Sequence, residues 1–87
     1  MYAVEASQRV QKFLDKLDQH LRERIEERLK KLGEIHIPSD AKFISRDEEG
    51  NKIFRYRIGD YRALYLVKDG EDLILIVKVG KRSRIYD

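Results

Sequence analysis

Residues 54–65 constrain the fold more than any other stretch of the chain, because they read as two β-strands joined by a two-residue turn. The runs on either side are rich in aromatic, β-branched and aliphatic residues, and Gly59-Asp60 between them suits a type II′ turn. A two-residue turn places Ile58 opposite Tyr61 and sets every later pair along the two strands. The stretch therefore predicts a β-hairpin with a defined register.

This register divides the side chains of the hairpin between two faces, because directly opposed residues share a face of a sheet. One face is apolar and is expected to lie on the core; it consists of Phe54, Tyr56, Ile58, Tyr61, Ala63 and Tyr65. The other face gathers arginines beside aliphatic side chains; these arginines are Arg55, Arg57 and Arg62.

The gathered arginines need an anionic partner. Like charges that face each other across two strands repel, and no acidic residue of these strands shares the face. Guanidinium groups bind phosphate through two parallel hydrogen bonds and stay charged at physiological pH. A phosphate backbone is therefore the first partner that we expect. The alternative is that the arginines only form the solvated face of a half-exposed sheet.

Eighty-seven residues, of which 41% are hydrophobic and 40% charged, predict a single domain over residues 1–87 with one modest core. The net charge of +3 comes from residues 41–87, where basic side chains cluster in the windows 52–67 and 78–84. Such clustering is typical of nucleic-acid surfaces. Apart from Asp60, the charged residues of these windows are Lys52, Arg55, Arg57, Arg62, Lys78, Lys81, Arg82 and Arg84.

Several classes of function lack support in the sequence. Without cysteine the chain offers no thiolate metal site, and its two histidines, His20 and His36, stand apart from clustered acids. No P-loop, dinucleotide-binding or serine-hydrolase motif occurs, so we expect neither a metal nor a cofactor. The lack of a long apolar run or leader sequence predicts a cytoplasmic protein without a membrane partner.

Two helices are expected before the main strands. Ser7 is placed to cap the first and Asp18 the second, and apolar residues follow each cap with helical spacing. They are Val10, Phe13, Leu14 and Leu17 in the first helix and Leu21, Ile25, Leu29 and Leu32 in the second. Strands are expected at residues 2–4, at 42–44, in the hairpin and at 73–79. The predicted fold class is α+β, with an antiparallel helix hairpin on one face of a mainly antiparallel, twisted, four- to five-stranded sheet.

The register of the last strand is ambiguous because residues 73–79 are apolar on both faces. A two-residue Asp69-Gly70 turn would direct Lys78 into the core. Pairing Val67 with Leu73 places Lys78 on the arginine face, and we prefer it because it leaves the lysine unburied. The core side chains of the strand are then Leu73, Leu75, Val77 and Val79. An apolar strip typical of a protein-binding surface remains near the arginines, made of Leu64, Leu66, Ile74 and Ile76.

The order of two helices followed by FRYRIGDYRALYLV and ILIVKVGKRSRIY resembles the RelE/ParE toxin superfamily, and within it the RelE branch of ribosome-dependent mRNA endonucleases. The resemblance covers nearly the whole chain. It implies a microbial RNase-like fold and the toxin of a type II toxin–antitoxin pair, which enters the ribosomal A site, cuts the mRNA there and blocks translation. The implied partners are a RelB-like antitoxin and the ribosome with its mRNA and rRNA. Whether the toxin–antitoxin complex also binds operator DNA stays open.

The resemblance also implies catalytic residues, which are Arg55, Arg57, Arg62, Arg82 and Tyr86. The residues that match Arg55 and Arg57 are commonly lysine in bacterial examples of the family. Arginine suits charge stabilisation better than proton transfer. The segment between Arg82 and Tyr86 is shorter than usual, so Tyr86 either assists catalysis or packs down the terminus. Other basic residues of the same windows are expected to contact RNA or the ribosome; they are Lys52, Lys78, Lys81 and Arg84.

The implied reaction needs no metal. The 2′-hydroxyl of the RNA attacks the adjacent phosphate, and the arginines offset the charge of the transition state. A basic-only site is expected to cut free RNA poorly and to rely on the ribosome for orientation of the substrate. Two alternatives stay open: a ParE-like toxin that poisons DNA gyrase, and a non-catalytic nucleic-acid-binding module.

Overall fold

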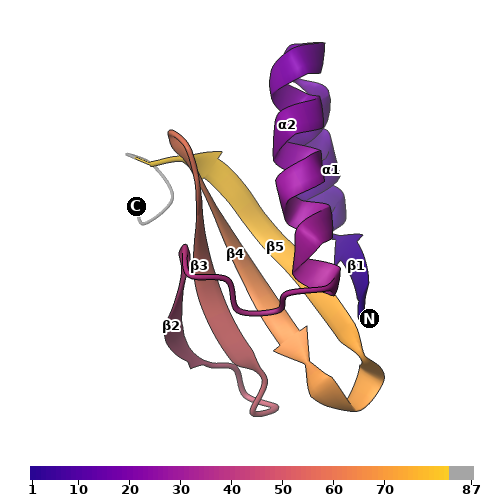
Figure 1. The fold of residues 1–87 in the computed structure, drawn as a ribbon, viewed down its shortest axis with the longest axis vertical. Helices are drawn as coiled ribbons and strands as arrows, with labels where there is room; N and C mark the ends of the chain where they lie inside the picture. Colours follow the sequence, from indigo (N-terminus) through magenta and orange to yellow (C-terminus); the bar gives the residue numbers. More distant parts are fainter. Residues whose placement is uncertain (83–87) are drawn as a thin grey trace.

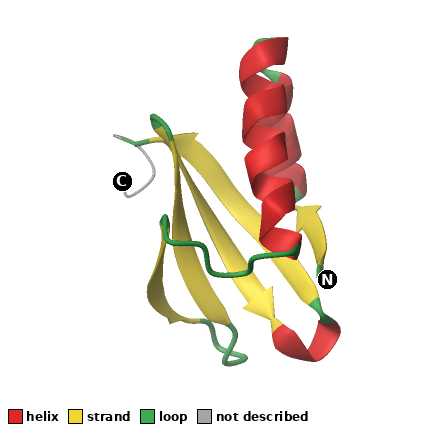
Figure 2. Ribbon diagram, in the orientation of Figure 1, coloured by secondary structure: helices red, strands yellow, loops and turns green. Residues whose placement is uncertain are grey.

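The computed structural model describes residues 1–82 of the chain. Within that range two α-helices pack on one face of a five-stranded sheet, as Figures 1 and 2 show. The helices are α1 (Gln8–Asp15) and α2 (Gln19–Lys30), and the strands are β1 (Ala3–Ala6), β2 (Ala41–Arg46), β3 (Lys52–Ile58), β4 (Tyr61–Lys68) and β5 (Leu73–Lys81). The strand order is β1-β5-β4-β3-β2, with β1 parallel to β5 and the other neighbours antiparallel. The predicted α+β class is confirmed.

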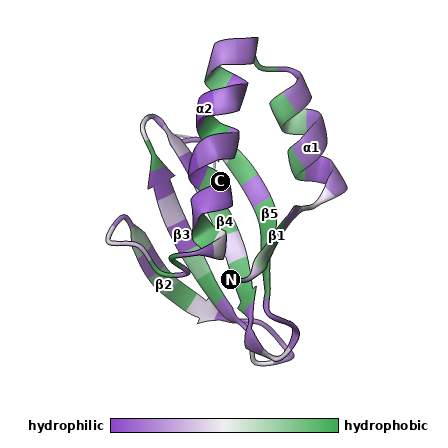
Figure 3. Cartoon of the chain, turned by 45° about the vertical axis from the view of Figure 1, so that its right-hand side comes forward, coloured by the Kyte–Doolittle hydropathy of each residue, from purple (hydrophilic) through white to green (hydrophobic). Residues whose placement is uncertain are grey.

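Both helices begin at the predicted caps. The Ser7 hydroxyl accepts a hydrogen bond from the backbone N–H of Val10, and the Asp18 carboxylate accepts from the N–H groups of His20 and Leu21. Figure 3 shows apolar and polar residues interleaved along each helix, as expected when one side is buried. The fully buried helix positions are Val10 and Leu14 in α1 and Ile25 and Leu29 in α2. Neither helix is long and apolar enough to cross a membrane, within the residues described.

The β3–β4 hairpin has the predicted register, from Ile58 opposite Tyr61 to Phe54 opposite Tyr65. Gly59 has a φ of +59°, which an L-residue adopts only with strain, so the turn requires glycine at this position. The core face is also as predicted, with Tyr61 half-buried and the remainder buried; the buried residues are Phe54, Tyr56, Ile58, Ala63 and Tyr65.

The predicted register of β5 is wrong. Val67 pairs with Ile74 instead of Leu73, because the connection from β4 occupies four residues and ends at Asp72 in the left-handed region. Ile74 and Ile76 are therefore buried, where Leu73, Leu75 and Val77 had been expected. A β-bulge at Val77 then shifts the alternation by one residue, since Tyr65 pairs with Ile76 and Leu64 with Lys78. Two expectations survive through this bulge: Val79 is buried, and Lys78 shares a face with the arginines.

The observed register of β5 also changes which residues form the predicted apolar strip on the open face. Ile74 and Ile76 belong to the core, and Leu75 takes their place on the open face, paired with Leu66. The half-buried strip consists of Leu64, Leu66, Leu73 and Leu75.

After α2, a short 3-10 helix (Lys31–Gly33) is followed by residues 34–40, which lead to β2 across the helix-bearing side of the sheet (Figure 1). The Tyr65 hydroxyl rises from the core and donates a 2.6 Å hydrogen bond to the carbonyl of His36. The His36 ring stacks on Tyr2, with ring centroids 3.8 Å apart. These contacts fix residues 34–40 to the core, and they place Ser39 and Asp40 at the end of the β2–β3 pair.

Replacing Gly33 with alanine is expected to lower the free energy of unfolding by about 1–3 kcal/mol, as overpacking does. A Cβ at Gly33 would lie 2.6 Å from the carbonyl oxygen of Tyr2, whose own N–H donates to the Gly33 carbonyl. The backbone must therefore shift where the 3-10 helix after α2 contacts Tyr2, the residue before β1. Denaturant titration would measure the loss. Gly70→Ala is the matched control, because its Cβ meets nothing within 4 Å, and equal destabilisation of both variants would contradict the steric explanation.

Candidate functional site

A hollow of about 450 Å³ lies where the open face of the sheet meets the β3–β4 turn. We call it the arginine hollow. Its lining residues come from four elements and their ends; they are Ser39, Asp40, Lys42, Arg55, Arg57, Arg62 and Arg82. The four arginines that were predicted to be catalytic therefore line the same hollow.

The β3–β4 register explains how the hairpin arginines meet. Arg57 lies directly opposite Arg62, next to the turn, and Arg55 follows two residues back on the same face. Arg82 comes from the end of β5, where its backbone N–H donates a 2.9 Å hydrogen bond to the carbonyl of Asp60 in the turn. The last strand therefore returns to the tip of the hairpin and adds its arginine there.

The guanidinium group of Arg62 is held against the turn. Its Nη1 donates to the carbonyls of Gly59, at 2.8 Å, and Tyr61, at 2.9 Å. Partial burial lowers the pKa of Arg62, and the nearby charges of Arg57, Arg82 and Arg55 lower it further. The concentrated positive charge is unfavourable in itself, and a bound anion would relieve it.

Arg28, on α2, links the buried core to the rim of the hollow. Its Nε donates to the Tyr56 hydroxyl at 3.1 Å, and its Nη2 contacts Asp40 Oδ2 at 3.0 Å and the carbonyl of Arg57 at 3.2 Å. The guanidinium also lies over the Tyr56 ring, 5.3 Å from its centroid. The hydrogen bond with Tyr56, above all, raises the pKa of Arg28. Arg28 therefore stays charged and fixes Asp40 beside β3.

A sequence profile described as "ParE toxin of type II toxin-antitoxin system, parDE" matches residues 4–86. The chain belongs to this toxin family. It is a type II toxin of the RelE/ParE superfamily, which confirms the resemblance seen in the sequence. Among curated proteins nothing matches.

Solved structures of RelE proteins share the fold of the toxin. A chain of the archaeal RelE–RelB complex from Pyrococcus horikoshii OT3 is 28% identical, with a TM-score of 0.82 over 95% of this chain and 97% of that one. A chain of the toxin–antitoxin complex RelBE2 from Mycobacterium tuberculosis is 26% identical, with a TM-score of 0.76 over 93% of this chain and 98% of that one. The isolated Escherichia coli RelE toxin, at 23% identity, supports the fold alone; its TM-score is 0.75, over 99% of this chain and 92% of that one.

Three other predicted contact residues of the toxin, Lys52, Lys78 and Lys81, do not line the arginine hollow. Lys52 pairs with Val67 at the far end of β3, and alternation from the buried Phe54 puts it on the helix-bearing side. Lys78 is on the same open face as the arginines, but it lies on β5, opposite Leu64 of β4. Lys81 lines a neighbouring hollow beside α2, which Arg82 also lines. The fourth contact residue, Arg84, and the predicted catalytic residue Tyr86 lie outside the described residues.

Sequence reasoning missed Lys42 and Asp40. Lys42 lies opposite Arg55 in the β2–β3 pair, and Asp40 lies opposite Arg57 one residue before β2 begins. Neither position could be assigned without the register of β2, which the sequence left undefined. The expectation of a basic-only site is therefore wrong, because the hollow of the toxin also contains a carboxylate.

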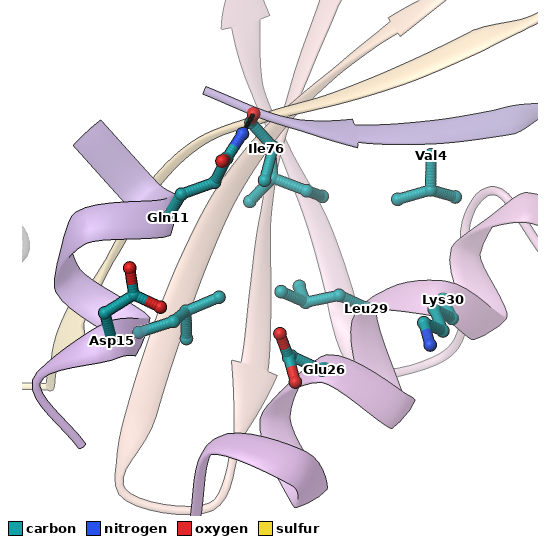
Figure 4. Close-up of a pocket in the computed structure, with 9 residues that line it drawn as sticks. Val4, Gln11, Asp15, Glu26, Leu29, Lys30 and Ile76 are labelled. Atoms are coloured by element: carbon teal, nitrogen blue, oxygen red, sulfur yellow. Dashed lines mark hydrogen bonds between the residues drawn. The ribbon is translucent and has the colours of Figure 1, made fainter. Parts of the chain in front are cut away.

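A second hollow, of about 340 Å³, lies between the helices of the toxin and strands β1 and β5. Figure 4 shows that Asp15 of α1 and Glu26 of α2 contribute carboxylates to its lining, to which Lys30 of α2 also belongs. Its floor is apolar and includes Val4, Leu29 and Ile76. Two carboxylates disfavour an anionic ligand, so the arginine hollow is the better candidate for a phosphate site.

Proposed function

We propose that the toxin is a ribosome-dependent endoribonuclease that cuts mRNA in the A site and so blocks translation. One observation carries the proposal: guanidinium groups from β3, β4 and the end of β5 line the same hollow. Such a cluster binds a phosphate and stabilises the additional negative charge of a pentavalent transition state. The fold shared with RelE structures supports a toxin of nuclease type.

In the proposed reaction the 2′-hydroxyl of the RNA attacks the adjacent phosphorus. Arg55, Arg57 and Arg62 hold the phosphate oxygens, and Arg82 offsets charge on the leaving 5′-oxygen. We expect Tyr86, beyond the described residues, to assist proton transfer or to stack on a base. Lys81 and Arg84 act at longer range and steer the toxin to its negatively charged target.

The dependence on the ribosome has a structural reason. Among the described residues that line the hollow, none is aromatic, so these residues provide no aromatic ring on which a base could stack. It can hold a phosphate, but it has few groups to align the ribose for in-line attack. The ribosome supplies that alignment, which is worth several orders of magnitude in rate.

Cleavage on programmed ribosomes tests the proposal. Purified toxin is added to ribosomes stalled on a defined mRNA, and primer extension maps new 5′ ends in the A-site codon. Free mRNA and a toxin-free reaction are the controls. Breaks that appear in the A site only with ribosomes support the proposal, and intact mRNA at high toxin concentration would contradict it.

A second candidate, inhibition of DNA gyrase, is favoured by the ParE description of the matching profile. A gyrase poison needs surface contacts with the enzyme and no nuclease site. Gyrase-dependent double-strand breaks in plasmid DNA, with mRNA left intact, would favour this reading. Salt-sensitive nucleic-acid binding without either lesion would leave a binding module.

Co-expression with the antitoxin from the adjacent open reading frame is expected to relieve growth arrest and to yield a stable complex. The similar structures from P. horikoshii and M. tuberculosis are toxin–antitoxin complexes. On this toxin, a RelB-like antitoxin would cover the half-buried leucine strip and bring acidic side chains to the arginine hollow. Affinity purification and a growth assay check the prediction, and a toxin that neither co-purifies nor is neutralised would contradict it. Binding of operator DNA by the complex is a further proposal.

A further inference from the structure

The arginine hollow raises the question of where the proton of the attacking 2′-hydroxyl goes. Arginine and lysine side chains are hydrogen-bond donors without an acceptor, so they cannot take it in their charged forms. Ser39 offers only a neutral hydroxyl. Within the described part of the chain, Asp40 is the one lining residue with a carboxylate, which accepts hydrogen bonds and can accept a proton.

Asp40 is fixed at the rim by its backbone and by its side chain. Its carbonyl accepts a 3.2 Å hydrogen bond from the N–H of Arg57, which extends the β2–β3 pairing one residue past the Ala41–Tyr56 pair. Its Oδ2 contacts Nη2 of Arg28 at 3.0 Å. Arg28 is itself held by the Tyr56 hydroxyl and the Arg57 carbonyl. A carboxylate with such anchors keeps its place beside a bound phosphate.

We propose that Asp40 is a catalytic residue, the general base of the cleavage step; this inference rests on the proposed function. The 2′-O–H bond breaks and its proton moves to the carboxylate of Asp40, through the oxygen that Arg28 does not hold. The 2′-oxygen forms a bond to phosphorus, and the P–O5′ bond breaks. The 5′-oxygen leaves with the electron pair and takes a proton from water. The products are a 2′,3′-cyclic phosphate and a 5′-hydroxyl, and Asp40 returns its proton to solvent.

The assignment divides the work between two kinds of group. The guanidinium groups of Arg55, Arg57 and Arg62 bind and stabilise the phosphate, whereas Asp40 moves the proton. Arg28 is a positioning residue, since it acts through Asp40. Among the described residues, the charged groups that pair with Asp40 or line the hollow with it all carry positive charge; they are Arg28 from α2, Lys42 from β2, Arg57 and Arg55 from β3, Arg62 from β4 and Arg82 after β5.

Single-turnover cleavage by Asp40→Asn on programmed ribosomes tests the proposal. Asparagine keeps an oxygen acceptor for Arg28 but cannot take the proton, so the variant should fold and bind ribosomes like the parent. At saturating toxin we expect cleavage about a hundredfold slower or more, within the range for general-base catalysis. The parent rate should fall as the pH is lowered through the range in which carboxylates become protonated, and Asp40→Asn should lose that fall.

Three further variants separate a base from a structural carboxylate. Asp40→Glu should recover most of the lost rate, because it restores the carboxylate. Arg28→Met should slow cleavage yet keep the acidic fall of the pH profile, since the base is misplaced but present. Glu48→Gln, in the exposed turn between β2 and β3, removes one negative charge away from the hollow and should behave like the parent.

Two results would overturn the assignment while the nuclease function stands. One is an Asp40→Asn protein that cuts at the parent rate with the parent pH profile. The other is a variant whose defect lies wholly in ribosome binding and disappears at saturation, which would make Asp40 a contact residue. A parent toxin that leaves mRNA intact on ribosomes would instead overturn the proposed function, and the assignment of Asp40 with it.

Discussion

Replacing Arg82 with alanine is expected to slow the cleavage step by about a hundredfold or more at saturating toxin, because in the proposed reaction the side chain stabilises charge that develops only in the transition state. The backbone of Arg82 is tied to the hairpin turn through the Asp60 carbonyl, so the substitution removes the guanidinium without releasing the strand end. Ribosome binding should change little. Arg62→Ala should cause nearly as large a loss, since Arg62 lies at the same turn.

Lys81→Ala is the matched control for Arg82→Ala. Lys81 is the neighbouring residue and carries the same charge, but it pairs with Tyr61 and is not among the residues that line the arginine hollow. Its loss should weaken association, increasingly so as salt rises, and low salt should restore the activity. Single-turnover rates and ribosome binding across a salt series distinguish the two effects. An Arg82→Ala toxin that binds and cuts at the parent rate would remove Arg82 from the site.

Replacing Tyr65 with alanine is expected to lower the free energy of unfolding by about 3–5 kcal/mol, the range for large aromatic residues in cores. Tyr65 is fully buried, and its ring stacks on Phe54 with centroids 5.4 Å apart. Burial raises the pKa of Tyr65, so the hydroxyl stays protonated and donates to the His36 carbonyl. Loss of the side chain would therefore create a cavity and also release the connection between α2 and β2.

Two companion variants help to interpret the stability loss of Tyr65→Ala. Tyr65→Phe keeps the ring and loses only the hydrogen bond to His36, for an expected cost of about 1 kcal/mol. Arg62→Ala, on the open face, should also cost no more than about 1 kcal/mol, because its hydrogen bonds are partly exposed to water. Denaturant or thermal unfolding measures all of them. If Arg62→Ala destabilised the toxin as much as Tyr65→Ala, the assignment of faces would be wrong.

The sequence predicted the hairpin correctly because its register depends on short-range chemistry. A glycine at the first turn position and two flanking strands define the pairs from Ile58–Tyr61 onward without reference to the rest of the fold. β5 lacks any such local signal. Its residues are apolar on both faces, its connection from β4 contains a left-handed Asp72, and its alternation changes at Val77. Packing against the helices, more than pattern, decides which side chains it buries.

The candidate site divides in the same way. The alternation of side chains along the strands was enough to place Arg55, Arg57 and Arg62 on one face. The same alternation could have excluded Lys52 from that face, because Lys52 is two residues from the buried Phe54 on β3. Asp40 could not be found from the sequence, because its position depends on a hydrogen bond to Arg57 and an ion pair with Arg28 from a distant helix. Residues on regular strands are predictable from spacing, whereas a loop residue is placed by long-range contacts.

The two-faced β3–β4 hairpin separates the evolutionary constraints on this toxin. Inward residues such as Phe54 and Tyr65 determine whether the chain folds, whereas outward residues such as Arg57 lie on a surface that stability scarcely tests. Mutations can therefore accumulate on the outer face without loss of the scaffold. A lineage that inherits this hairpin can therefore exchange one binding partner for another by substitutions on the outer face, without rebuilding the core.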